Sequence, residues 1–204
     1  MSKVLLASRN AKKLAELRRV VAAAGLTGLD VVGLDDVPEY PEEPETGATF
    51  EANALIKARS GARATGLPCV ADDSGIAVDA LNGMPGVLSA RWSGVHGDDA
   101  ANNRLLLAQL SDVPTERRGT AFVSACALVS PEGDETVVRG EWRGVLLPEP
   151  KGDNGFGYDP LFAPDDDAAA GRSSAELSPQ EKDALSHRAK ALTQLLPALK
   201  ALGE

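Results

Sequence analysis

Val70-Ala71-Asp72-Asp73-Ser74-Gly75 lies in the middle of the chain, where an apolar run that begins at Leu67 leads into two neighbouring carboxylates. A short apolar run bounded by turn residues predicts a buried strand. Polar side chains at the exit of such a strand lie where α/β sheets bind ligands, beyond the carboxyl ends of the strands. The stretch therefore predicts an α/β fold with Asp72 and Asp73 beside a ligand.

The two carboxylates allow two interpretations. Adjacent like charges repel, so a structure tolerates them best beside a cation. Mg2+ prefers oxygen ligands, often one or two carboxylates together with substrate phosphates. Asp, Ser and Gly are also turn formers, so the same residues are typical of a β-turn. From this stretch alone both interpretations stay open.

Composition places the chain among ordinary soluble proteins. It has 204 residues, 43% of them hydrophobic and 25% charged, and no apolar run long enough to cross a membrane. The net charge of −9 argues against broad binding to nucleic acid or to a membrane surface. Cys69 and Cys126 both lie in apolar segments, which favours two buried thiols over a disulfide. We therefore expect a cytoplasmic protein.

Hydrophobic spacing and turn residues predict alternating strands and helices. No linker separates them, so we expect a single domain over residues 1–204. Pro197 is expected to kink or end the last helix. Strands are predicted at Lys3–Ala7, Val31–Leu34, Ile76–Leu81, Gly119–Ser130 and Thr136–Leu147, and helices after Ser8, at Phe50–Thr65, at Asp98–Leu110 and from the capping box at Ser178.

The first strand leads into a helix through small polar residues. Ser8 and Asn10 are both good N-cap residues. Unpaired N–H groups and the positive end of the helix dipole make such a start a ready anion site. Lys13, in the first turn, suits an anion nearby. A capped helix with a solvated lysine remains the alternative.

Several separate segments are explained together by one ligand. Lys13, Lys57, Lys182 and Arg188 supply positive charge, Glu45 and Asp73 can hold a divalent cation, and Phe156 in a glycine-rich loop can stack on a flat ring. A phosphate chain, a metal and a planar base together make a nucleoside triphosphate. The sequence contains neither a P-loop nor a GxGxxG motif after a strand.

The chain resembles the inosine triphosphate pyrophosphatases along nearly its whole length. Six ordered motifs carry the resemblance: Ser8-Arg9-Asn10-Ala11-Lys12-Lys13, Glu45-Thr46-Gly47 with Thr49-Phe50, Asn53-Ala54 with Lys57-Ala58, Ala71-Asp72-Asp73-Ser74-Gly75, Pro85-Gly86 with Ser89-Ala90-Arg91, and Gly155-Phe156-Gly157-Tyr158-Asp159-Pro160 followed later by Ser186-His187-Arg188.

The resemblance implies a mixed α/β fold with a long curved central sheet, flanking helices, two lobes around a cleft, and a homodimer. It implies hydrolysis of ITP, dITP and XTP to the monophosphate and pyrophosphate with Mg2+. By matching position, Asp73 and Lys57 are the catalytic residues, and Asp73 and Glu45 hold the metal. The implied substrate-binding residues are Ser8, Arg9, Asn10, Ala11, Lys12, Lys13 and Ser74 for the phosphates, and Phe156, Gly157, Tyr158, Asp159, Lys182, His187 and Arg188 for the base and sugar.

Some points stay open. Pro44 stands where some relatives have a glutamate, so Glu43 is an alternative to Glu45 as metal ligand. Lys182, His187 and Arg188 cannot share one face of a regular helix, so at least one must face elsewhere. A related pyrophosphatase for other modified nucleotides and a non-catalytic nucleotide sensor are the alternative functions.

Overall fold

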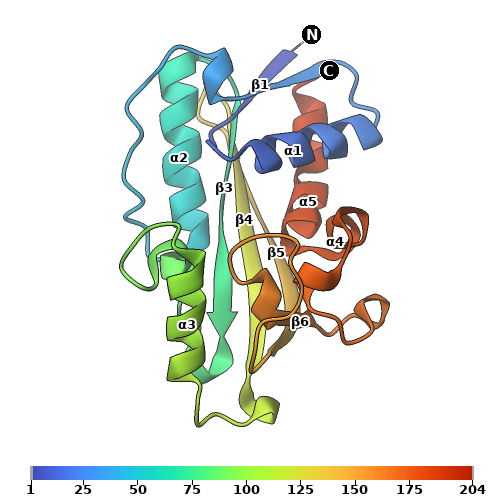
Figure 1. Cartoon of the computed structure of the whole chain (residues 1–204). Coiled ribbons are helices and arrows are strands. Elements are labelled where there is room, and N and C mark those ends of the chain that lie inside the picture. The colour runs from blue at the N-terminus through green and yellow to red at the C-terminus, as the bar shows by residue number, and fades with distance from the viewer. Residues whose placement is uncertain (1, 204) are drawn as a thin grey trace. The chain divides into compact units, whose positions relative to one another are not determined.

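The computed structural model describes residues 2–203 and confirms the mixed α/β fold (Figure 1). One six-stranded sheet has the order β2-β1-β3-β4-β5-β6. β1 pairs in parallel with β2 and β3, whereas β5 and β6 pair antiparallel. The strands are β1 (Ser2–Leu6), β2 (Leu29–Val32), β3 (Cys69–Val78), β4 (Gly119–Val129), β5 (Glu135–Leu146) and β6 (Phe162–Pro164), and the helices are α1 (Ala11–Ala23), α2 (Phe50–Thr65), α3 (Asp99–Gln109), α4 (Pro179–Leu185) and α5 (His187–Ala201).

The chain folds into two compact units. Unit 1 comprises the chain up to Asp73, Ser124–Gly140 and the chain from Arg188 onward, and unit 2 comprises Ser74–Val123 and Glu141–His187. Strands β3, β4 and β5 each contribute residues to both units. The two units agree with the two lobes that the resemblance implies, while the cleft and the single domain over residues 1–204 stay predictions.

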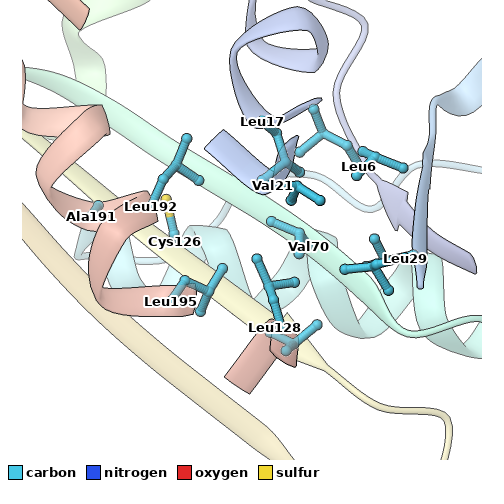
Figure 2. Close-up of a cluster of buried hydrophobic side chains, with 13 residues drawn as sticks. Leu6, Leu17, Val21, Leu29, Val70, Cys126, Leu128, Ala191, Leu192 and Leu195 are labelled. Atoms are coloured by element: carbon cyan, nitrogen blue, oxygen red, sulfur yellow. The ribbon is translucent and has the colours of Figure 1, made fainter. Parts of the chain in front are cut away.

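The core of unit 1 lies between one face of its strands and helices α1 and α5 (Figure 2). Helix α1 contributes an apolar stripe to this core, because Leu17 and Val21 are buried in it and Leu14 packs against it. Burying each large aliphatic side chain contributes about 1.5–3 kcal/mol relative to leaving it exposed. The buried members are Val4, Leu6, Leu29, Val31, Val70, Cys126 and Leu128 from the strands and Leu17, Val21, Ala191, Leu192, Leu195 and Leu199 from the helices.

Helix α2 covers the other face of these strands. Thr49 caps its N-terminus by accepting from the Ala52 N–H at 3.2 Å, and Gly66 ends it in the left-handed conformation. Small residues bring the helix close to the sheet: a Cβ atom added at Gly61 would lie 2.5 Å from the Sγ atom of Cys69. The predicted bounds of α2 are therefore confirmed.

Unit 2 has a second core, rich in aromatic side chains. The ring of Phe162 lies edge-on to Phe122 and Trp142, with centroid distances of 4.7 and 5.2 Å. Leu106 and Leu110 of the α3 segment belong to the same cluster. Edge-to-face aromatic pairs add about 0.5–1.5 kcal/mol each to the free energy of unfolding beyond their buried area.

The prediction of a turn or strand exit at Asp72–Gly75, with a separate strand at Ile76–Leu81, is wrong. β3 runs unbroken for ten residues. It lies between β1 and β4 in the sheet, and this pairing outweighs the turn preference of the residues. β1 pairs with Cys69 and Val70 of β3 and then ends at Leu6, so the two carboxylates still lie just beyond the carboxyl end of β1.

The prediction of one helix after Ser178 is also wrong. The capping box at Ser178 is confirmed, but α4 stops at Ser186, whose backbone is extended, and α5 begins at the next residue. Leu185 packs against the core of unit 2, whereas Leu192 is buried in that of unit 1. The break lets each helix follow its own core. Pro197 does not end α5, which continues to Ala201.

The expectation for the two cysteines is borne out within the described part of the chain. Cys69 and Cys126 are buried free thiols, and burial raises the pKa of each to about 12. No helix between residues 2 and 203 is both long and apolar enough to span a bilayer. The predicted strand at Val31–Leu34 begins earlier than expected, as β2 at Leu29.

Candidate active site

Asn10 organises the start of α1. Its side chain accepts hydrogen bonds from the backbone N–H groups of Lys12 at 2.9 Å and Lys13 at 3.4 Å, and the hydroxyl of Ser8 accepts from the N–H of Asn10 at 3.2 Å. The first turn of α1 carries no acidic residue. The predicted cap is confirmed, and the helix start keeps the positive end of its dipole for an anion.

The first carboxylate of the central stretch, Asp72, belongs to a buried ion cluster. Its Oδ2 lies 2.8 Å from Nζ of Lys13 and 3.2 Å from Nε of Arg188. A longer contact of 3.5 Å joins Nη1 of Arg188 to Oε2 of Glu16. The side chain of Asp72 is only 5% exposed and that of Arg188 10%. Helices α1 and α5 thus each bring a cation to one carboxylate of β3.

The cluster favours the charged forms of Asp72 and Arg188. Burial alone would raise the pKa of Asp72, but Lys13 and Arg188 together hold it well below its usual range. Burial lowers the pKa of Lys13 despite the attraction of Asp72. The pKa of Arg188 is raised, because the charges of Asp72 and Glu16 outweigh its burial. The pair of cations is therefore neutralised inside the protein, where an unpaired charge is costly.

The second carboxylate, Asp73, faces helix α2. Its Oδ2 accepts from the amide Nδ2 of Asn53 at 2.9 Å. Burial raises the pKa of Asp73, as does the charge of Glu45, while Lys57 and the Asn53 hydrogen bond oppose the shift. A carboxylate with a raised pKa is a better proton acceptor near neutral pH than an exposed one.

Neighbouring side chains on a strand point to opposite faces of the sheet. Asp72 therefore meets α1 and α5, and Asp73 meets α2, which corrects the expectation that both carboxylates share one cation. The structure gives the two carboxylates different partners, since Asp72 pairs with Lys13 and Arg188 and Asp73 accepts a hydrogen bond from Asn53.

Glu45 lies at the Asp73 side of the sheet. Its Oε1 accepts from Nζ of Lys57 at 2.6 Å. The charges of Glu45 and Lys57 both act on Asp73, so the three groups are neighbours. Glu43 instead pairs with Arg63 on the exposed surface. Of the two candidate metal glutamates, the geometry therefore favours Glu45.

The donor set of Glu45 and Asp73 fits a hard divalent cation, because two carboxylates supply oxygen ligands and substrate phosphates can supply more. Within residues 2–203, no three His, Cys, Asp or Glu side chains gather as a complete protein-made metal site. Such a pair is typical of a cation bound together with its substrate.

In unit 2, the glycine-rich loop is organised around Asp159, which is 2% exposed. Its carboxylate accepts from the Phe156 N–H at 2.8 Å, from the Ser174 hydroxyl at 2.7 Å and from Nζ of Lys182 at 2.5 Å. A Cβ atom added at Gly155, whose φ is +81°, would lie 2.1 Å from this carboxylate. Glycine is therefore required there for the loop to close.

The loop leaves one aromatic ring exposed. Phe156 is 44% exposed, and Nζ of Lys182 lies 5.2 Å from its ring centroid. Tyr158 is buried and its hydroxyl donates to the carbonyl of Ser89 at 2.8 Å, so Tyr158 supports the loop. The backbone of Gly157 is bound by α3, whose Asp99 accepts from its N–H at 2.7 Å.

The structure groups the predicted residues by unit. Lys13, Glu45, Lys57, Asp73 and Arg188 lie in unit 1 with the start of α1, whereas Phe156–Asp159 and Lys182 lie together in unit 2. His187, the last residue of unit 2, stacks on Phe122 at a centroid distance of 5.0 Å.

The remaining predicted residues lie nearer the solvent. Arg9 is exposed and pairs with Glu42 through a 2.7 Å hydrogen bond, and Ala11 and Lys12 are exposed on α1. Ser74 is half-buried, next to Asp73 on β3.

Sequence reasoning missed two residues of this site. Glu16 lies one turn after Lys13 on the same face of α1, and this spacing indicates that it can join the same ion cluster. In the structure it contacts Arg188 there. Asn53 was noted only as part of a motif, although a polar residue between apolar neighbours on a helix indicates a buried partner.

Comparison with known proteins gives consistent matches. The Ham1 family matches residues 4–198. A dITP/XTP pyrophosphatase of Nocardia farcinica is 71% identical over 204 residues, which is 100% of this chain and 98% of the relative. The crystal structure of a nucleoside-triphosphatase / dITP/XTP pyrophosphatase from Mycobacterium abscessus is 68% identical, with a TM-score of 0.81, and covers 97% of this chain and 99% of that one.

A more distant solved structure, a HAM1 protein from Coxiella burnetii, is 39% identical with a TM-score of 0.87, over 98% of this chain and 100% of that one. The family resemblance found in the sequence is confirmed: the chain belongs to the Ham1 family of inosine triphosphate pyrophosphatases.

Proposed function

We propose that this protein hydrolyses non-standard purine nucleoside triphosphates, namely ITP, dITP and XTP, to the monophosphate and pyrophosphate in the presence of Mg2+. The names of its close relatives support this activity. The observation that supports it most is the placement of two neighbouring carboxylates on opposite faces of β3. Asp72 forms ion pairs with Lys13 and Arg188, and Asp73 lies near Glu45 and Lys57 on the other face.

The N-terminus of α1 is proposed to bind the phosphates. The positive end of its dipole and the ammonium of Lys13 both attract phosphate oxygens, and the ammonium can donate a charge-assisted hydrogen bond to them. In the structure, the Asp72 carboxylate pairs with the Lys13 ammonium, as an anionic ligand would. Ser8 and Ser74 are proposed to assist as hydroxyl donors.

Asp73 is proposed to take the proton from the attacking water. Glu45 and Asp73 would hold the Mg2+ ion, which when bound neutralises phosphate charge and favours ionisation of water. Lys57 is held by Glu45 at 2.6 Å and is proposed to stabilise the charge that develops on the transferred group. The chain thus supplies base, metal ligands and cation from β3, α2 and the segment before α2.

The exposed ring of Phe156 is proposed to stack on the purine, with Lys182, Asp159 and His187 on the base and sugar side. A 6-oxo purine presents an acceptor where adenine presents a donor, so a cationic donor favours the first. Arg188 is proposed to supply that donor, since its guanidinium stays charged and presents a fixed fork.

Pyrophosphate release from a panel of triphosphates, measured with and without Mg2+, tests the proposal. Rapid release from ITP, dITP and XTP, slow release from ATP, and dependence on Mg2+ support it. Faster hydrolysis of a modified pyrimidine nucleotide would favour the related pyrophosphatase. Tight binding with no pyrophosphate release would favour the sensor. The homodimer and the cytoplasmic location remain proposals, and light scattering of the purified protein checks the first.

Lys13→Ala is expected to weaken binding and turnover of all triphosphates alike, because Lys13 is proposed to meet phosphate rather than base. Removing one charge-assisted hydrogen bond costs about 1.5–3 kcal/mol of binding free energy, and kcat/KM falls by the corresponding factor. Values of kcat/KM for ITP, XTP and GTP should fall by a similar factor. A loss confined to one base would place Lys13 at the wrong end of the nucleotide. Arg19→Ala, which removes an exposed basic side chain farther along α1, is the matched control.

Arg188→Ala is expected to reduce the preference for ITP over ATP by roughly 1–3 kcal/mol, the usual cost of leaving a polar partner unmade. The measurement compares kcat/KM for ITP, XTP and ATP between variant and wild type. Because Arg188 also pairs with Asp72 and Glu16, the melting temperature of the variant is measured in parallel. An equal fall for all three nucleotides would assign Arg188 to the phosphates or the fold.

A further inference from the structure

Asn53 is a buried side chain of α2 that connects two parts of unit 1. It is 1% exposed. Its amide Nδ2 donates to Oδ2 of Asp73 at 2.9 Å, and its Oδ1 accepts from the backbone N–H of Gly47 at 2.8 Å. One amide group therefore joins the proposed general base to the segment that carries Glu45.

The chemistry of the two partners sets the orientation of this amide. The Gly47 N–H can only donate, so it needs the amide oxygen, and an ionised Asp73 can only accept, so it needs the NH2 group. A flipped amide would place its oxygen against the carboxylate and its NH2 against another N–H. Asn53 thus has a single favourable arrangement, and that arrangement fixes one oxygen of Asp73.

The segment before α2 approaches Asn53 as closely as the backbone permits. A Cβ atom added at Gly47 would lie 2.7 Å from Oδ1 of Asn53 and 2.7 Å from Cβ of Ala52. Gly47 stands two residues after Glu45. The hydrogen bond to Asn53 consequently limits where the Glu45 backbone can lie.

Lys57 follows Asn53 by one helical turn and lies on the same face of α2. Asn53 binds Asp73, and Lys57 binds Glu45 at 2.6 Å. The two carboxylates with which the proposed metal site is built are therefore each held by one residue of the same helix face.

We propose that Asn53 is a positioning residue for the hydrolysis: its amide holds the Asp73 carboxylate and the Glu45 segment in the one arrangement that binds the metal and directs the base. This inference rests on the proposed function. It predicts that Asn53 affects kcat and metal affinity, and at saturating Mg2+ leaves the KM for the nucleotide nearly unchanged, because Asn53 is assigned no contact with the nucleotide.

The test compares Asn53→Ala and Asn53→Asp with Asn102→Ala. Asn53→Asp retains an acceptor for the Gly47 N–H but has no NH2 group for Asp73. Asn102 is the matched control, since it is also 1% exposed on a helix, accepts from the Ser93 N–H at 2.7 Å and donates to a backbone carbonyl, that of Ala90. Turnover of ITP and the melting temperature are measured for each variant. Binding of Mn2+, followed by the paramagnetic resonance of the ion, is measured with and without a non-hydrolysable ITP analogue.

Both Asn53 variants are expected to lose about 10- to 100-fold in kcat and about tenfold in Mn2+ affinity, as when other outer partners of metal ligands are removed. Asn102→Ala should lower the melting temperature as much as Asn53→Ala, with kcat and Mn2+ affinity near wild type. Retention of kcat and Mn2+ affinity in Asn53→Asp, or equal losses in Asn102→Ala, would overturn the proposal. If the wild type released no pyrophosphate, the proposed function would fail, while the Mn2+ measurement would still decide the role of Asn53.

Discussion

Asp73→Asn is expected to lower turnover of ITP by about 100- to 10,000-fold, the range typical of losing a general base. Asparagine keeps the shape of the side chain on β3 but cannot accept the proton of the attacking water. The variant should still fold and bind nucleotide, because the cluster around Asp72 lies on the opposite face and is unchanged. The measurement is kcat for ITP together with the affinity for a non-hydrolysable ITP analogue.

Asp79→Asn is the matched control for this experiment. Asp79 directly follows β3 and forms an exposed ion pair with Arg143, with 2.7 Å between Oδ2 of Asp79 and Nη2 of Arg143. Turnover in this control should stay near the wild-type value. Retention of more than half of the wild-type activity in Asp73→Asn would remove Asp73 from the mechanism.

Asp72→Asn is expected to produce the largest loss of stability, about 3–5 kcal/mol in the free energy of unfolding, because breaking a buried ion pair leaves its partners uncompensated. Here two cations, Lys13 and Arg188, lose the carboxylate that both contact. Chemical denaturation at neutral pH measures the change. Asp79→Asn breaks an exposed pair and should cost no more than about 1 kcal/mol.

The origin of this loss can be checked by removing one of the buried cations. Adding Lys13→Met to Asp72→Asn should recover part of the stability, since one unpaired charge is replaced by an apolar side chain. A loss of less than about 1 kcal/mol in Asp72→Asn would contradict the buried cluster, as that is the range of an exposed pair. A double variant as unstable as the sum of the two single variants would contradict the coupling of Lys13 with Asp72.

Local patterns predicted the elements whose signals are carried by their own residues. One of the two candidate N-cap residues, Asn10, caps α1, and the predicted bounds of α2 at Phe50–Thr65 are correct, since capping depends on residues within one turn. The six motifs also identified the family and the residue types of the site. None of these predictions requires knowledge of a distant partner.

The errors arose where distant residues decide the structure. Asp72–Gly75 has the composition of a turn but is extended, because β3 is paired in the interior of the sheet. The helix breaks at Ser186 because Leu185 packs against the core of unit 2, whereas Leu192 is buried in the core of unit 1. The helical spacing of apolar residues does not show in which hydrophobic core each turn of the helix will be buried.

The division of the two aspartates between faces follows from the same strand geometry. Once β3 is known to be continuous, the alternation of side chains places Asp72 and Asp73 apart. The sequence motif marks both carboxylates, but only the packing of α1, α2 and α5 shows that one binds protein cations while the other binds Asn53.

The most direct test of the proposed reaction is 31P NMR of the wild-type protein with dITP and Mg2+. The proposal requires cleavage between the α- and β-phosphates, so the signals of dITP should be replaced by those of dIMP and pyrophosphate in equal amounts. Formation of dIDP and inorganic phosphate, or persistence of intact dITP under conditions where the protein is folded, would contradict the account.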